Sequence, residues 1–91
     1  MKKYVLFYKS AADVQAKAPV YFAAHRARWD EFRAQKTLLM IGPFADRREG
    51  AMSIFTSYEA AEEFARSDPF VLNGVVDEWL IREWHEAIAD S

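Results

Sequence analysis

The 91-residue sequence contains no cysteine, only three glycines and three prolines, and no long apolar run. Without cysteine the chain can form no disulfide, no thiolate-ligated zinc site and no thiolate nucleophile. No apolar run approaches the ~20 residues that a membrane-spanning helix needs, so we expect no membrane association. The apolar start of the chain, at residues 4–8, is too short for the core of a signal peptide, and the cytoplasm is the expected location.

The sequence also has no large excess of charge of either sign. Twelve basic residues against fourteen acidic ones give a formal net charge of −2, which offers no general attraction to nucleic acid. Hydrophobic residues, by contrast, make up 52% of the chain and aromatic residues 15%. A chain this short forms one domain, which we take to span residues 1–91. Its core is too small to enclose so many large apolar side chains, so some should line a pocket or a subunit interface.

Local patterns predict four strands and two helices. Buried-strand patterns cover residues 4–8 and 37–41, a weakly alternating strand pattern covers 52–56, and a fourth strand is expected at 75–84; helical patterns cover residues 19–35 and 58–66. We expect Pro19 to begin the first helix, after a capping box from Ser10 to Asp13. We also expect Gly42 and Pro43 to end the second strand.

This order of elements predicts an α+β fold of the ferredoxin-like βαββαβ type, with both helices on one face of a four-stranded antiparallel sheet. In the first strand both parities are apolar: Tyr4, Leu6 and Tyr8 alternate with Val5 and Phe7. The second sheet face therefore also needs cover. A second copy related by a two-fold axis is the simplest cover, so we expect a homodimer.

The first predicted helix carries a histidine among aromatic residues. At 100° per residue, Phe22, His25, Trp29 and Phe32 lie within about 80° of one another, which puts His25 inside the apolar stripe. A buried imidazole needs hydrogen-bond partners. A carboxylate partner would fix its tautomer and leave the other ring nitrogen free for proton transfer.

Asp68 is the candidate for that partner. Tyr58, Ala65 and Asp68 recur at helical spacing, so Asp68 leaves the second helix on its core-facing side. Because both helices cover the same sheet face, His25 and Asp68 can meet between them. Each residue also has a simpler interpretation: His25 as a packed core residue, and Asp68 as the N-cap of a short helical turn that starts at Pro69. One carboxylate can serve both purposes.

The other candidates carry weaker signals. His85 lies beside Glu83 near the end of the last strand, where we expect it in solvent. The two histidines do not fall into a metal-binding spacing, so we predict no metal. There is no glycine-rich phosphate loop, and Ser53 has no adjacent base that would make it a nucleophile. Residues 46–50 are interpreted as a charged turn.

Several segments, taken in order with the upstream His25, resemble the YCII-related (YciI-like) family. The segments are Leu38-Leu39-Met40-Ile41-Gly42-Pro43, Ser57-Tyr58-Glu59-Ala60-Ala61, Asp68-Pro69-Phe70, Asn73-Gly74-Val75 and Ile81-Arg82-Glu83-Trp84. The resemblance implies a place in the dimeric α+β barrel superfamily, in which two ferredoxin-like subunits pack sheet against sheet. It also implies that His25 and Asp68 form an active-site pair.

Relatives in this superfamily include a dehydrochlorinase acting on a chlorinated hydroxyquinol, and muconolactone isomerases. The resemblance thus implies lyase or isomerase chemistry without a cofactor on a small cyclic oxygenated metabolite. We expect Arg28, Trp29, Phe70 and Tyr8 to contact that ligand. One alternative is a non-catalytic small-molecule-binding or accessory homodimer. Another is an oxygenase or haem-binding protein of the same superfamily.

Two positions depart from the family pattern. Many relatives have an arginine three residues before the histidine, where this sequence has Phe22. Many also have a serine at the start of the third strand after a longer glycine-rich loop, and here the equivalent place is about Glu49. If those groups bind substrate in the relatives, this protein takes a different substrate or has lost the activity.

Overall fold

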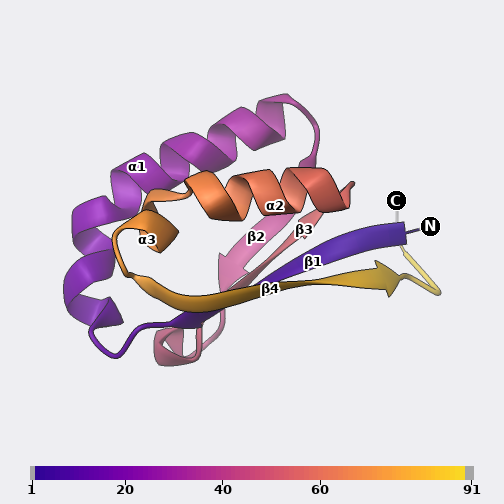
Figure 1. Ribbon diagram of the computed structural model, residues 1–91. Helices are drawn as coiled ribbons and strands as arrows, with labels where there is room; N and C mark the ends of the chain where they lie inside the picture. Colours follow the sequence, from indigo (N-terminus) through magenta and orange to yellow (C-terminus); the bar gives the residue numbers. More distant parts are fainter. Residues whose placement is uncertain (1, 90–91) are drawn as a thin grey trace.

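The computed structural model describes residues 2–89. Its elements are, in order, β1 (Lys2–Ser10), α1 (Val14–Ala34), β2 (Leu38–Pro43), the 3₁₀ turn η1 (Arg47–Glu49), β3 (Ala51–Phe55), α2 (Tyr58–Ser67), α3 (Pro69–Leu72) and β4 (Val76–His85). The strands form one antiparallel sheet in the order β2-β3-β1-β4, and the helices lie on one side of it (Figure 1). The predicted ferredoxin-like α+β fold is confirmed. No helix in this part of the chain is long and apolar enough to cross a membrane.

The core lies between the sheet and the helices. The central strand β1 contributes Leu6, and three phenylalanines pack above it: Phe32 from α1, Phe55 from β3 and Phe64 from α2. The rings of Phe32 and Phe64 meet edge to face with centroids 5.2 Å apart. Burying each such side chain stabilises the fold by roughly 1.5–3 kcal/mol, so this cluster holds α1 and α2 against the sheet.

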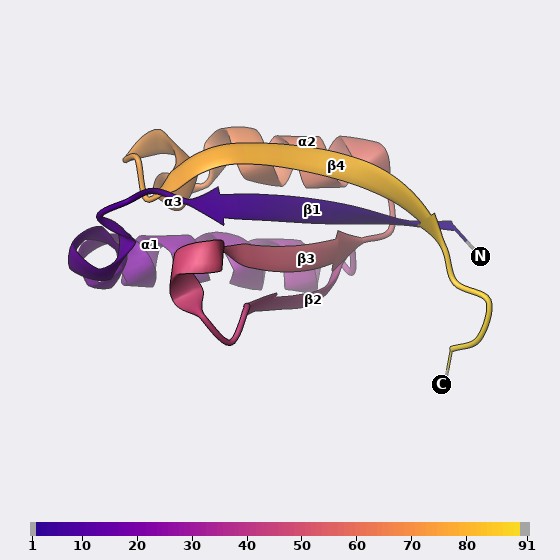
Figure 2. The ribbon, with the colours of Figure 1, turned by 90° about the horizontal axis from the view of Figure 1, so that it is seen from below.

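The strand register separates the two faces of the sheet. Leu6 pairs with Ser53 on β3 and with Ile81 on β4, and all three face the helices. The alternate positions face the opposite side, which Figure 2 shows from below with the helices behind the sheet. The apolar residues on this helix-free face are Val5, Phe7, Met40, Met52, Ile54, Leu80 and Trp84. Both sheet faces are thus apolar, as the pattern of β1 predicted.

The first helix begins earlier than predicted. α1 starts at Val14 and Pro19 lies inside it, so the expectation that Pro19 is its first residue is wrong. Proline has no N–H to offer the carbonyl of the preceding turn. In the turn before Pro19 the Val14 side chain is buried, and Lys17 and Asp13 form a surface ion pair 3.3 Å apart.

Two further local details differ from what the sequence predicts. Ser10 begins no capping box: it is the last residue of β1, and its hydroxyl donates to the carbonyl of Arg47 at 2.6 Å. Asp13 is the N-cap of α1 without a side-chain hydrogen bond. Strand β2 ends at the Gly-Pro step as expected, but it includes Gly42 and Pro43 and so extends two residues beyond the predicted 37–41. It is an edge strand, where a missing N–H need not break a ladder hydrogen bond.

Candidate functional site

Asp68 lies at the junction of α2 and α3, where the chain turns. Its backbone is extended (φ −71°, ψ 124°), as the residue before a proline must be, and Pro69 begins α3. The Asp68 side chain is fully buried, and its Oδ1 accepts the N–H of Phe70 at 3.0 Å. The break in the helix thus both caps α3 and turns a carboxylate into the core.

Two side chains from other elements bind the same carboxylate. Nδ1 of His25, from α1, lies 2.7 Å from Oδ1 and 2.9 Å from Oδ2 of Asp68. The hydroxyl of Tyr8, from β1, donates to Oδ2 at 2.7 Å. With the N–H of Phe70, three donors from separate elements surround one carboxylate. A buried charge costs several kcal/mol unless such donors are present, so the network is what makes the burial tolerable.

The Tyr8 hydroxyl is a permanent member of this network. Burial raises the pKa of the Tyr8 phenol far above its ordinary value, and the charge of Asp68 and the hydrogen bond to it raise this pKa further. The phenol therefore stays protonated and donates. We predicted Tyr8 as a ligand contact; its side chain does line the pocket described below, but its hydroxyl is committed to Asp68.

The imidazole of His25 is fixed by its neighbours. It stacks on Phe70, with centroids 3.9 Å apart and planes 5° from parallel, and meets Trp29 edge-on at 5.2 Å. Because Nδ1 faces a carboxylate, that nitrogen carries the ring proton and Nε2 carries a lone pair in the neutral form. Nε2 has no hydrogen-bond partner among residues 2–89, yet it is not sealed from solvent. The free nitrogen is therefore accessible from the pocket that His25 lines.

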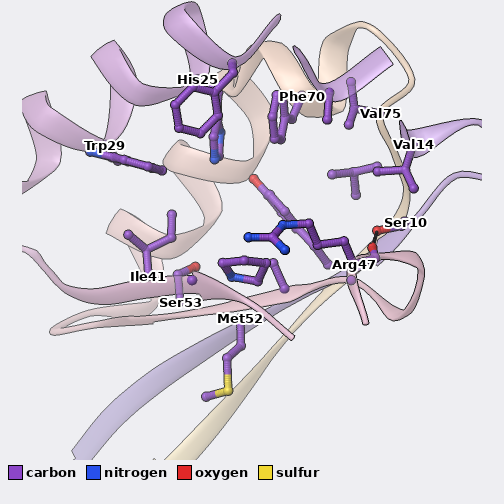
Figure 3. Close-up of a pocket in the computed structure, with 18 residues that line it drawn as sticks. Ser10, Val14, His25, Trp29, Ile41, Arg47, Met52, Ser53, Phe70 and Val75 are labelled. Atoms are coloured by element: carbon purple, nitrogen blue, oxygen red, sulfur yellow. Dashed lines mark hydrogen bonds between the residues drawn. The ribbon is translucent and has the colours of Figure 1, made fainter. Parts of the chain in front are cut away.

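That pocket has a volume of about 320 Å³ and lies between the helices and the sheet (Figure 3). Apolar side chains form most of its wall, including Val14, Phe22, Trp29, Ile41, Phe70 and Val75. Its side-chain polar groups come from Tyr8, Ser10, His25, Arg47 and Ser53. A second hollow of about 360 Å³, lined by Phe22 and Arg47 among others, adjoins the first through residues that the two share.

The predicted ligand contacts divide into two groups. Trp29, Phe70 and the side chain of Tyr8 line the pocket, but Arg28 does not. The Arg28 guanidinium binds Glu31 at 2.7 Å and the hydroxyl of Ser67 at 2.5 Å. Arg28 lies about 60° from His25 around the helix, which turns it toward α2 and away from the pocket. Arg28 is therefore outside the pocket where it was expected to meet a ligand.

Sequence reasoning missed three polar residues of the pocket: Ser10, Arg47 and Ser53. Ser53 lies on the helix-facing side of β3 and is buried, and the two-residue period of the strand could have placed it there. Arg47 belongs to η1, and its guanidinium extends into the pocket (Figure 3). No pattern in residues 46–50 tells which of Arg47 and Arg48 turns inward.

The remaining histidine lies apart from this site. His85 is exposed at the end of β4, and its Nε2 contacts a carboxylate oxygen of Glu83 at 2.5 Å. Within the described residues no group of three or more histidine, aspartate or glutamate side chains is placed to hold a metal ion.

A family model described as the YCII-related domain matches residues 1–85. The chain belongs to the YCII-related family. The uncharacterized protein YjpA of Bacillus subtilis (strain 168) is 40% identical to this YCII-related protein over 65 residues, which cover 70% of this chain and 75% of YjpA.

Solved structures share the fold at lower identity. The dehydrochlorinase TftG of Burkholderia phenoliruptrix AC1100, in complex with 2,5-dihydroxybenzoquinone, has a TM-score of 0.74 and 20% identity over 93% of this chain and 95% of its own. Rv0793 of Mycobacterium tuberculosis has a TM-score of 0.57 and 15% identity over 99% and 98%. A variant of MhuD with two manganese protoporphyrin IX bound per active site has a TM-score of 0.53 and 12% identity over 100% and 99%. These likenesses show that the chain shares the fold of these proteins.

Proposed function

We propose that this YCII-related protein is a cofactor-independent lyase or isomerase in which His25 moves a proton on a small cyclic oxygenated metabolite. One observation carries the proposal. Nδ1 of His25 is held at 2.7 Å by the fully buried carboxylate of Asp68, while the ring lines an open pocket. Asp68 would orient the ring and stabilise its charged form when Nε2 accepts a proton, and proton transfer by a positioned side chain contributes typically 10²–10⁴-fold in rate.

The chemistry needs only the substrate and this pair. In an elimination, Nε2 of His25 removes a proton from carbon, the C–H electrons form a double bond, and the leaving group departs with its bonding electrons. In an isomerisation, the same imidazolium returns the proton to another carbon. Phe70 covers one face of the ring and Trp29 packs against it edge-on, and this apolar contact would strengthen the charge interaction with Asp68 during transfer.

The size of the pocket supports a small ligand. A volume of about 320 Å³ is at the lower end of the range for small-molecule sites and suits one or two rings rather than a porphyrin. The complex of TftG with 2,5-dihydroxybenzoquinone supports the same class of oxygenated ring for this chain. The haem-binding alternative fits the pocket less well.

The active form in this proposal is a homodimer joined through the helix-free face. Met40, Leu80 and Trp84 on this face are 65%, 50% and 46% exposed. Covering such side chains with those of a second copy stabilises association by up to roughly 1.5–3 kcal/mol each. A two-fold dimer places the same patch on both partners, as a self-complementary apolar face requires.

The test is turnover of a panel of lactones and halogenated hydroxyquinols by wild type and two matched variants. His25→Gln removes the pocket imidazole, and His85→Gln removes the exposed imidazole that also contacts a carboxylate. We expect a rate loss of about 10²–10⁴-fold for the first variant and none for the second. Retention of the full wild-type rate by His25→Gln would exclude the imidazole from the chemistry.

A second candidate is a non-catalytic binding protein. The stacking of His25 on Phe70 and its edge contact with Trp29 are also what a packed structural histidine needs. In that case ligands of the same panel would raise the melting temperature of wild type, and no product would form. His25→Gln would then cost stability without an associated loss of turnover.

A further inference from the structure

The turn between β2 and β3 places one cation in the pocket. The side chain of Arg47 extends toward the space between His25 and Ser53 (Figure 3), and Arg47 lines both the inner pocket and the adjoining hollow. Among residues 2–89 its guanidinium belongs to none of the ion pairs. A guanidinium presents a planar fork of donors that matches an oxyanion, so this exposed side chain is free to bind one at the pocket.

The next residue in the chain shows the contrast. Arg48 also lies in η1, but its Nε and Nη2 bind the carboxylate of Asp46 at 3.0 and 2.8 Å. Asp46 therefore neutralises Arg48 and not Arg47. Both arginines are exposed, but Arg48 is held in an ion pair, whereas Arg47 lines the pocket and belongs to no ion pair among residues 2–89.

The turn itself is fixed to the site. The Ser10 hydroxyl donates to the carbonyl of Arg47 at 2.6 Å, which joins η1 to the end of β1. Gly50 has a φ of +117°, and a Cβ there would lie 1.8 Å from the carbonyl oxygen of Tyr8. The backbone carrying Arg47 is therefore packed against the residue whose hydroxyl binds Asp68. This arrangement lowers the entropy that the turn would lose when a ligand binds.

We propose that the ligand of this pocket is a ring compound bearing an ionised oxygen, such as a ring carboxylate, and that Arg47 binds that oxygen. The inference rests on the proposed function for the identity of the site, and it adds the charge of the substrate. Apolar walls at Trp29, Ile41 and Phe70 take the ring, and Arg47 takes the anion at the mouth. His25 then meets the ring itself and not its charged substituent.

Binding of matched anionic and neutral probes tests this. The first pair is 2,5-dihydroxybenzoate and its methyl ester. The second is 2,5-dihydroxybenzoquinone, which ionises as a vinylogous acid, and its dimethyl ether. Dissociation constants are measured by calorimetry on wild type, Arg47→Gln, Arg47→Lys and the control Arg48→Gln. The two pairs distinguish a carboxylate from an ionised ring hydroxyl as the preferred anion.

We expect wild type to bind the anion of at least one pair about tenfold more tightly than its neutral partner, the effect of one charge-assisted pair. Arg47→Gln should abolish this preference, Arg47→Lys should retain part of it, and Arg48→Gln should leave it intact. Raising the salt concentration should weaken binding of the anion only. A preference that survives in Arg47→Gln would overturn the proposal, and so would the absence of any preference in wild type.

These outcomes are separate from those of the catalytic test, because binding needs no turnover. Preference for the anion through Arg47, with no product from any substrate, would uphold the charge assignment and refute the enzyme. The opposite outcome would be turnover of neutral rings that is unchanged in Arg47→Gln and abolished in His25→Gln. That result would uphold the enzyme and refute the charge assignment.

Discussion

Replacing Asp68 is the most informative perturbation of the site, because this carboxylate connects β1, α1 and α3. Asp68→Ala would remove the cap of α3, at about 1 kcal/mol. It would also leave the Tyr8 hydroxyl and Nδ1–H of His25 buried without an acceptor, at about 1–3 kcal/mol each. The total of about 3–7 kcal/mol approaches the whole stability of a small domain, typically about 5–15 kcal/mol.

Asp68→Asn separates the charge from the shape. The amide carbonyl of the asparagine can still accept from two donors, and its NH₂ can donate to the hydroxyl oxygen of Tyr8 or to Nδ1 of His25. What is lost is the charge assistance of two hydrogen bonds, so we expect a smaller destabilisation of about 1–3 kcal/mol. If the NH₂ faces Nδ1, the ring proton moves to Nε2 and His25 can no longer act as a base toward the pocket.

The assay is urea unfolding followed by far-UV circular dichroism, run at several protein concentrations because association stabilises a folded chain. Nitrogen-15 shifts of the imidazole report which ring nitrogen carries the proton. Asp46→Asn is the control, since Asp46 also accepts a backbone N–H, that of Arg48 at 3.0 Å, but lies at the surface. We expect a much smaller change there. Equal urea midpoints for wild type and Asp68→Asn, with unchanged imidazole shifts, would refute the network as described.

Three further predictions concern Tyr8, the turn and the sheet. Burial beside Asp68 raises the pKa of the Tyr8 phenol. Unfolded chains therefore release this proton above pH ~10, whereas folded chains keep it. Urea midpoints measured across pH should show that stability falls above pH ~10 in wild type and falls less in Tyr8→Phe. Gly50→Ala should cost at least about 1–3 kcal/mol in thermal unfolding because of its positive φ and the contact with a carbonyl, whereas Gly42→Ala, with open space around it, should be nearly neutral. Leu80→Lys should convert the proposed dimer into a monomer, as measured by light scattering. Leu72 is also an exposed leucine but lies on α3, so Leu72→Lys should leave the dimer intact.

Helical periodicity was sufficient to place the two residues of the central pair. His25 lies in the apolar stripe of α1, and Asp68 ends the core-facing side of α2. Two helices on one sheet face leave few places for such side chains, and in the structure they are in direct contact. The Asp-Pro step also predicted the cap of α3, since residues before proline are extended and aspartate accepts a backbone N–H.

The rest of the site depends on contacts that local patterns do not contain. Val14 joins the pocket because α1 starts before Pro19, and its side chain is buried there. Arg28 was expected to contact a ligand, but it binds Ser67 on α2. Arg47 was expected only as part of a charged turn, but it lines the pocket from η1. The orientation of η1 depends on its bond to Ser10, 37 residues away in the sequence, and no propensity scale reports such a contact.

A fully buried carboxylate is a costly feature in a chain of 91 residues. Replacing a buried ion pair by apolar side chains of similar volume is often neutral or stabilising, so stability alone gives little reason to keep Asp68 beside His25. Capping of α3 explains one of its oxygen contacts, the one with the N–H of Phe70. It does not explain why the residue is a buried aspartate, since a serine would cap α3 about equally well. It explains neither the Tyr8 phenol aimed at the other oxygen nor the accessible Nε2 on the far side of the ring. Both features fit the proposed role of the imidazole in the pocket, and under that proposal His25→Gln should impair turnover more than folding.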